Sequence, residues 1–186
     1  MATCLLLHIP LKSPNPNSRT SKITCSSITD QSQVAKRNLL NLVSDQERGL
    51  STQKNPIRRA SIIEAIDALA SLSKDTVTTG DSLSATWRLL WTTEKEQLFI
   101  IQNANLFGTE AGDVLQVIDV EKRTLNNVIT FPPAGVFFVR STIEIASSQR
   151  VNFRFETVYL DDEIRVVKDI RGDYLIVDRA PYTWKE

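Results

Sequence analysis

The chain has 186 residues, 41% of them hydrophobic, which is enough for one ordinary domain with a buried core and argues against global disorder. Its 22 basic and 22 acidic side chains cancel. However, Lys12, Arg19 and Lys22 lie in the first 29 residues, which hold no acid, so 19 basic residues face all 22 acidic ones in the remainder. Nucleic acid is therefore not an expected partner, because a phosphate-binding surface needs an excess of Lys and Arg.

Residues 1–29 have the composition of an import signal. They are rich in Ser and Thr, free of acidic residues and interrupted by three prolines, which is typical of plastid or mitochondrial transit peptides. Serine far outnumbers arginine, so we predict a disordered plastid transit peptide of residues 1–29, cleaved near residues 24–30. A plain disordered N-terminus is the alternative.

The remaining body lacks the side chains that most enzymes use. His8, Cys4 and Cys25 all lie in the predicted leader, so the body has neither the commonest general base nor a thiol nucleophile, disulfide or thiolate metal site. No Walker loop, GxGxxG, HExxH or GxSxG motif occurs. The acidic residues at 161–163 are interpreted as solvated turn residues. We expect no enzyme, no cofactor and no metal.

Residues 30–74 are predicted to form a helical pair that covers the rest of the domain. Apolar residues recur at helical spacing over 31–47 and again over 56–72. Gly49 suits the left-handed end of the first helix, and Asn55 and Pro56 suit the cap and first turn of the second. Residues 50–55 are expected to be a polar connection. A polar linker then ends in Thr-Thr-Gly-Asp, a turn signal.

Residues 75–186 are predicted to be an antiparallel β-barrel or sandwich, which makes the fold mainly β (α+β), with no helix after Leu83. Many short strands joined by tight turns favour this architecture, and closing a barrel removes exposed edges. About eight strands leave an interior just wide enough for packed side chains or one small ligand. The predicted strands are 84–93, 96–103, 112–120, 125–131, 136–146, 149–159, 162–168 and 172–179.

The stretch 83–93 is the one around which the predicted barrel is organised. Trp87, Leu89 and Trp91 share one parity of this strand and should therefore face inward together. Two interpretations stay open for this face: a packed core, or the wall of an apolar pocket. The side chains predicted to line such a pocket are Trp87, Leu89, Trp91, Phe99, Val117, Phe138, Phe153 and Phe155.

Two further expectations concern aromatic and basic residues near this strand. Trp87 is expected near the helix-covered end with a structural role, and Trp91 nearer the opposite rim with a role in binding. Arg88 and Arg165 are expected to point outward; the alternative is that one of them stacks on an indole as a cation–π contact.

Four motifs in order resemble the plastid lipid-associated proteins, also called the plastid fibrillin (PAP/fibrillin) family. Leu83-Ser-Ala-Thr-Trp-Arg-Leu-Leu-Trp-Thr-Thr93 is similar to the family's LSGTWRLLYTT strand, with Ala85 in place of Gly and Trp91 in place of Tyr. The other three matching stretches are the Arg48-Gly49 turn after a helix, residues 112–128, and residues 157–173.

The resemblance implies a lipocalin-like barrel in plastids, associated peripherally with plastoglobules or thylakoids. It implies binding of hydrophobic isoprenoid lipids such as carotenoids, quinones and tocopherols, without catalysis. The alternative function is an interaction module whose helical pair docks on a protein partner, an enzyme of plastid isoprenoid-quinone synthesis. An enzyme that uses Asp, Glu, Tyr or Arg inside the barrel is the third hypothesis.

Overall fold

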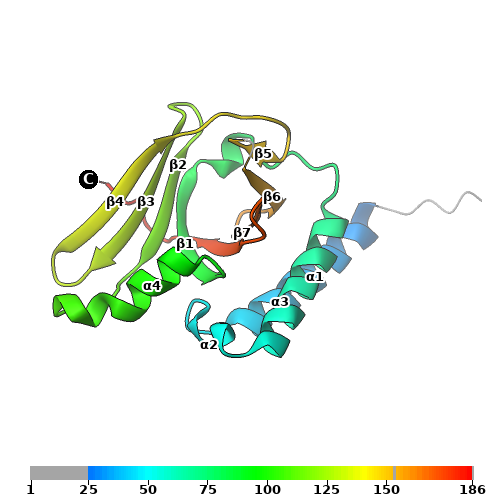
Figure 1. Cartoon of the computed structure of the whole chain (residues 1–186). Helices are drawn as coiled ribbons and strands as arrows, with labels where there is room; N and C mark the ends of the chain where they lie inside the picture. The colour runs from blue at the N-terminus through cyan, green and yellow to red at the C-terminus, as the bar shows by residue number, and fades with distance from the viewer. Residues whose placement is uncertain (1–24, 153, 186) are drawn as a thin grey trace, which may run out of the picture.

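The computed structural model describes residues 25–152 and 154–185, so most of the predicted leader and Phe153 lie outside the described residues. Five helical segments precede or interrupt the strands (Figure 1): α1 (Cys25–Val43), α2 (Leu50–Gln53), α3 (Pro56–Leu72), the 3₁₀ turn η1 (Asp81–Leu83) and α4 (Lys95–Asn103), which continues into the 3₁₀ turn η2 (Ala104–Phe107). The strands are β1 (Ala85–Thr92), β2 (Val114–Asp119), β3 (Thr124–Phe131), β4 (Gly135–Thr142), β5 (Arg150–Val151), β6 (Phe155–Leu160), β7 (Ile164–Asp169) and β8 (Tyr174–Arg179).

All eight strands belong to one antiparallel sheet in the order β4-β3-β2-β1-β8-β7-β6-β5. The sheet curls into a half-barrel (Figure 1). At one end, the chain that leaves β4 returns beside β5: Ile145 forms an antiparallel bridge with Val151, and the Asn152 amide donates to the Glu144 carbonyl at 2.8 Å. The predicted mainly β, lipocalin-like fold is confirmed. The wall stays open along most of β4.

The helices α1 and α3 pack side by side on the outer face of the β6–β7–β8 part of the sheet (Figure 1). Asn55 caps α3 by accepting from the Arg58 amide at 2.9 Å, and Pro56 occupies its first turn, as predicted. The apolar stripes of α1 and α3 form one buried cluster with the sheet, and this cluster includes Leu39, Ile62 and Ile66. The apolar faces of the helical pair are therefore buried against the protein's own sheet.

A bulge in β1 changes the direction of Trp91. The pairing with β8 runs from Leu89–Val177 to Trp91–Ile176, so Leu90 is an extra residue in β1. Because side chains alternate along a strand, the extra residue moves Trp91 to the outer face. Trp91 belongs to the cluster under α1 and α3, whereas Leu89 belongs to the interior cluster. The prediction that the two indoles share one face is wrong.

The segment predicted as a strand at 96–103 is the helix α4, so the expectation of no helix after Leu83 is also wrong. The run Leu-Phe-Ile-Ile has strand propensity, but Leu98 and Ile101 lie one helical turn apart and face the protein, while Lys95 and Gln102 are exposed. The eight-strand total survives because predicted strand 149–159 divides into β5 and β6. Residues 50–53, predicted as a polar connection, form the short helix α2.

The C-terminal segment covers the outer face of the other half of the sheet. The Ala180 amide donates to the Thr86 carbonyl at 2.8 Å, and the Trp184 amide donates to the Thr86 hydroxyl at 3.2 Å. The Trp184 ring lies 5.8 Å from the ring of Phe138. With the helices on one half and this segment on the other, the inner face is left for the second buried cluster, which contains Trp87 and Leu89.

Candidate functional site

A cavity of about 240 Å³ lies between α4 and the inner face of the sheet. It is bounded by five strands and by one side of α4, and it reaches the surface beside β4, where the sheet ends without a neighbour. Its wall is mainly apolar, as is usual for small-molecule sites. The apolar side chains that line it are Leu89, Ile100, Val114, Ile129, Phe137, Val139, Leu175 and Val177.

Three polar side chains form a chain of hydrogen bonds at the inner end of this cavity. Gln116 on β2 donates through Nε2 to Oδ1 of Asn127 on β3 at 3.0 Å. Its Oε1 accepts from Nη2 of Arg165 on β7 at 2.7 Å. These residues come from three different strands and meet across the barrel. The other polar side chains in the wall of the cavity are Glu96 and Gln97 of α4.

A second, smaller void of about 20 Å³ lies deeper, beside Arg165. Gln116 lines both spaces, so it marks the boundary between them. Phe155 and Thr157 of β6 form part of the deeper wall. The end of the half-barrel beside Arg165, which we call the narrow end, is therefore nearly filled with side chains. The end near α4, the wide end, contains most of the empty volume.

Trp87 lies in the interior cluster at the narrow end, next to Arg165. It is fully buried, and its Nε1 donates to the Leu83 carbonyl at 2.9 Å. The guanidinium of Arg179 lies over its ring with Cζ 4.6 Å from the ring centre, and Arg165 approaches with Cζ at 5.9 Å. The cation–π contact considered in the sequence thus exists, with Arg179 as the nearer partner.

The two arginines singled out in the sequence behave differently. Arg88 points outward, as predicted, and forms an ion pair with Asp178 in which Nη2 and Oδ2 lie 2.6 Å apart. This pair raises the pKa of Arg88. Arg165 points inward, contrary to the prediction. Burial lowers its pKa to about 9, so its guanidinium remains a cation at neutral pH.

The wide end of the cavity has an apolar rim. Phe137 and Val139 line the cavity from β4, yet they are 51% and 48% exposed. Val136 and Phe138, on the other face of the same strand, are also exposed. Leu106, next to α4, adds a further exposed apolar side chain. Such a concentration marks a surface where ligands, proteins or membranes bind.

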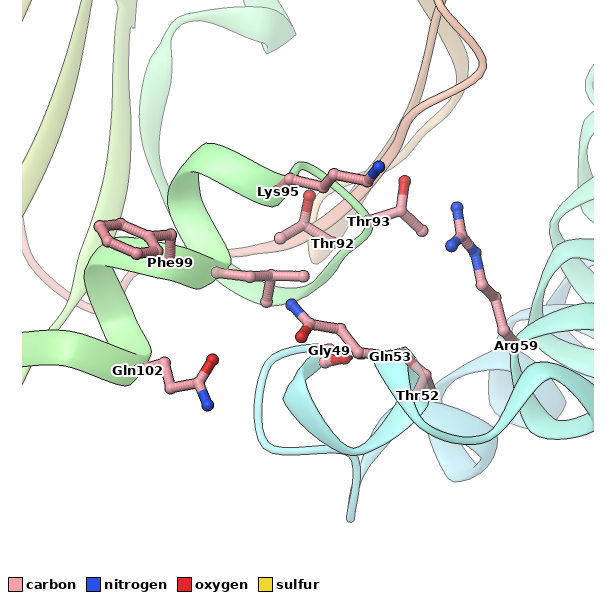
Figure 2. Close-up of a pocket in the computed structure, with 10 residues that line it drawn as sticks. Gly49, Thr52, Gln53, Arg59, Thr92, Thr93, Lys95, Phe99 and Gln102 are labelled. Carbon is pink, nitrogen blue, oxygen red and sulfur yellow. Dashed lines mark hydrogen bonds between the residues drawn. The ribbon is translucent and has the colours of Figure 1, made fainter.

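A separate groove of about 390 Å³ lies outside the barrel, between the helical hairpin and α4 (Figure 2). Figure 2 shows Thr52, Gln53 and Arg59 on one side, and Lys95, Phe99 and Gln102 on the other. Its lining is more polar and it is more open to solvent than the barrel cavity. We therefore take the barrel interior as the candidate ligand site.

Comparison with known proteins identifies the family of the chain. The PAP_fibrillin family model matches residues 33–158. A curated relative, "Probable plastid-lipid-associated protein 11, chloroplastic" of Arabidopsis thaliana, is 60% identical over 187 residues, which is 89% of this chain and 88% of the relative. The chain belongs to the PAP/fibrillin family of plastid lipid-associated proteins. No solved structure matches it.

The structure brings together only part of the site predicted for this PAP/fibrillin chain. Leu89 lines the 240 Å³ cavity, Phe155 lines the deeper void and Trp87 lies in the interior cluster. The other predicted residues lie elsewhere. Trp91 packs under the helices, Val117 and Phe138 are on the outer face, Phe99 on α4 is 66% exposed and lines the outer groove, and Phe153 is outside the described residues.

The residues of the fibrillin interior that sequence reasoning missed include Gln116, Phe137, Val139 and Arg165. The run Val136–Val139 is continuously apolar, so its parity cannot be assigned from the sequence. For Arg165 a signal existed. It is a lone charge in the run Ile-Arg-Val-Val, and a strand of that composition is buried on both faces.

Two absences bear on chemistry. Within residues 25–152 and 154–185, no group of three or more His, Cys, Asp or Glu side chains is placed to hold a metal ion. No helix in this described part of the fibrillin is long and apolar enough to cross a membrane.

Proposed function

We propose that this protein is a non-enzymatic lipid-binding protein of the plastid that holds one hydrophobic isoprenoid lipid, such as a quinone, tocopherol or carotenoid, in the half-barrel. The observation that carries the proposal is the apolar cavity that opens beside β4. Membership of the plastid lipid-associated family supports it. Plastid location is supported by the "chloroplastic" name of the Arabidopsis relative and by the acid-free leader.

The volume of the cavity limits how the lipid is held. Sites that enclose a drug-sized ligand measure roughly 300–1,000 Å³, and the cavity measures about 240 Å³. A whole carotenoid or long-chain quinone is larger than such a ligand, so only one end of it enters. The remainder of the molecule lies across the mouth, against Phe137 and Val139.

The apolar rim gives the same mouth a second role. The exposed apolar side chains of β4 can insert shallowly among lipid tails. We propose that the protein associates peripherally with the surface of a plastoglobule or thylakoid through this rim. The mouth would then face the lipid phase from which the ligand comes.

The alternative function, in which the helical pair docks on a biosynthetic enzyme, has less support. The apolar stripes of α1 and α3 are buried against the sheet, so a partner would meet mainly their polar sides. Deleting residues 30–74 would also uncover buried side chains such as Leu39 and Ile66 and destabilise the barrel.

The test compares two substitutions on the same strand. Val139→Asp places a carboxylate on the cavity rim, and Val136→Asp places one on the opposite face of β4 at nearly equal exposure, 48% against 50%. A short-chain prenylquinone is titrated into the full chain and its variants. Val139→Asp should weaken binding roughly tenfold, since it puts a charge in the path of an apolar ligand. Equal affinities of the two variants, or no binding by the unsubstituted chain, would refute interior binding.

A further inference from the structure

Arg165 is a buried cation whose hydrogen-bonding capacity is mostly unused. Its exposure is 4%, and within residues 25–152 and 154–185 its side chain has one hydrogen bond, from Nη2 to Gln116. Nε and Nη1 are buried and have no hydrogen-bond partner among the described residues. Fewer than one buried polar group in ten lacks a partner in folded proteins. Two on one guanidinium therefore point to something that binds there.

The charge of Arg165 is also uncompensated. Within the described residues, every carboxylate that forms an ion pair with an arginine pairs with an arginine other than Arg165, as Asp178 does with Arg88. Around Arg165 are the neutral amide of Gln116, the hydroxyl-bearing Thr157 and the indole ring of Trp87. Burying an unpaired charge costs several kcal/mol, and an apolar residue of similar size would usually stabilise the fold more. A monoanion bound at this position would remove that cost.

The room beside Arg165 restricts the anion. The deeper void measures about 20 Å³, slightly above the 10–15 Å³ that one water molecule requires. One oxygen atom of a carboxylate fits this space, and the charge of a carboxylate balances the single positive charge of Arg165. A diphosphate is larger and carries more negative charge than one arginine balances. A purely hydrocarbon end would leave both free nitrogens without an acceptor.

Among the described residues, Gln116 is the one that lines both spaces, so the position beside Arg165 adjoins the apolar cavity at this side chain. A ligand whose head reaches Arg165 therefore has its chain in the 240 Å³ cavity, directed to the mouth beside β4. We infer that the half-barrel binds a single-chain amphiphile with a carboxylate head, the carboxylate accepting a hydrogen bond from one of the two unpartnered nitrogens of Arg165, Nε or Nη1, and the chain occupying the apolar cavity. The inference rests on the proposed function, because the same cavity holds the chain.

The experiment measures the preference for the acid over its neutral ester. cis-Parinaric acid and its methyl ester, which share a fluorescent chain, are titrated into the full chain in parallel with the short-chain prenylquinone. The unsubstituted protein should bind the acid roughly tenfold or more tightly than the ester, as expected for hydrogen bonds between charged groups. Arg165→Met should reduce the affinity for the acid to that for the ester, and the ratio of these two affinities is the quantity compared between variants. Arg165→Lys, which keeps the charge, should restore part of the preference.

Arg171→Met is the matched control, because it makes the same substitution on the exposed β7–β8 turn; it should keep the full preference. Equal binding of acid and ester by the unsubstituted protein would overturn the carboxylate inference, and this comparison needs no variant to fold. If the quinone still binds in that case, interior lipid binding stands. If none of the three probes binds, the proposed function fails as well.

Discussion

Trp87 and Trp91 lie on opposite faces of the same strand, although they are an even number of positions, four, apart. Trp87 faces the interior, where Arg179 lies over its ring, and Trp91 faces α1 and α3. A second bulge has the same effect in β6, where the pairing with β7 shifts between Thr157 and Tyr159. The two bulges turn additional side chains outward on both sides of β7 and β8. The helices therefore have a wide apolar surface on which to pack.

This arrangement predicts that Trp91 has a structural role and no contact with ligand. Trp91→Phe should reduce the free energy of unfolding by about 1–3 kcal/mol, because it leaves a gap under the helices and removes the 3.1 Å hydrogen bond from Nε1 to the Thr52 hydroxyl. Prenylquinone affinity should stay within twofold of that of the unsubstituted chain. Urea unfolding and ligand titration measure the two quantities. A large loss of affinity in a variant of nearly normal stability would place Trp91 at the ligand instead.

The sequence was sufficient for the family and for the order of the elements other than α2 and α4. Turn residues and alternation located seven of the strand regions, and the cap at Asn55 located α3. The sequence was insufficient to predict which side chains of each strand point into the barrel. A bulge shifts the alternation by one residue, and β1 carries no Gly or Pro to mark the bulge at Leu90.

The site was only partly predictable for the same reason. Residues were assigned to the interior by parity and aromatic character, which selected Trp91 and Phe138. The run Leu-Phe-Ile-Ile had a strand-like composition, so α4 and its boundary with the cavity were missed. Arg165 was assigned outward because arginine is usually exposed. The apolar run around it, Ile-Arg-Val-Val, was the one local sign that this strand is buried on both faces.

Gly49 is predicted to be one of the least replaceable residues outside the barrel. Its φ is 114°, and a Cβ atom there would lie 2.2 Å from the Thr92 carbonyl oxygen. Gly49→Ala should therefore force the Arg48 segment away from β1 and destabilise the protein by several kcal/mol. Gly172→Ala is the control, since φ is also positive, at 85°, but no atom lies within 4 Å of the added Cβ; it should cost only about 1–2 kcal/mol. Similar thermal shifts for the two variants would contradict the close contact.

Lys36 is predicted to anchor α1 to the β6–β7 turn. Its Nζ lies 2.7 Å from Oδ2 of Asp161 and 2.8 Å from Oε2 of Glu163, and only 6% of the side chain is exposed. Lys36→Met should leave Asp161 half-buried without its cation and destabilise the fold by roughly 2–4 kcal/mol, somewhat less than for a fully buried pair. Arg37→Met, at the adjacent exposed position, is the control. Chemical unfolding of the two variants should differ; equal stability would show that the ion pair contributes nothing.

The same pair predicts a loss of stability in acid. Hydrogen bonds from Lys36 and from backbone amides, opposed by burial, hold the pKa of Asp161 below its usual value. A carboxyl group with a lowered folded pKa stabilises the protein above its unfolded pKa and loses that contribution as the pH falls through the folded pKa. The unsubstituted chain should therefore lose stability below about pH 4, and Lys36→Met should lose less over that interval. Parallel acid profiles would contradict this assignment.

Glu94, the residue that caps α4, is predicted to make stability fall as the pH rises toward neutrality. Burial and the nearby charge of Asp173 raise its pKa to about 7, although Gln97 donates a hydrogen bond to it. Because the unfolded pKa is about 4.3, the folded state binds more protons than the unfolded state between these two values. Stability should then decline from about pH 4.5 to 7 and level off above. Glu94→Gln should remove this decline, matching the unsubstituted chain near pH 4.5 and exceeding its unfolding free energy at pH 8.

Glu121→Gln, on an exposed turn, should keep the original profile. Urea unfolding at intervals from pH 4.5 to 8 measures all three proteins, and a Glu94→Gln profile with the original slope would show that another group titrates.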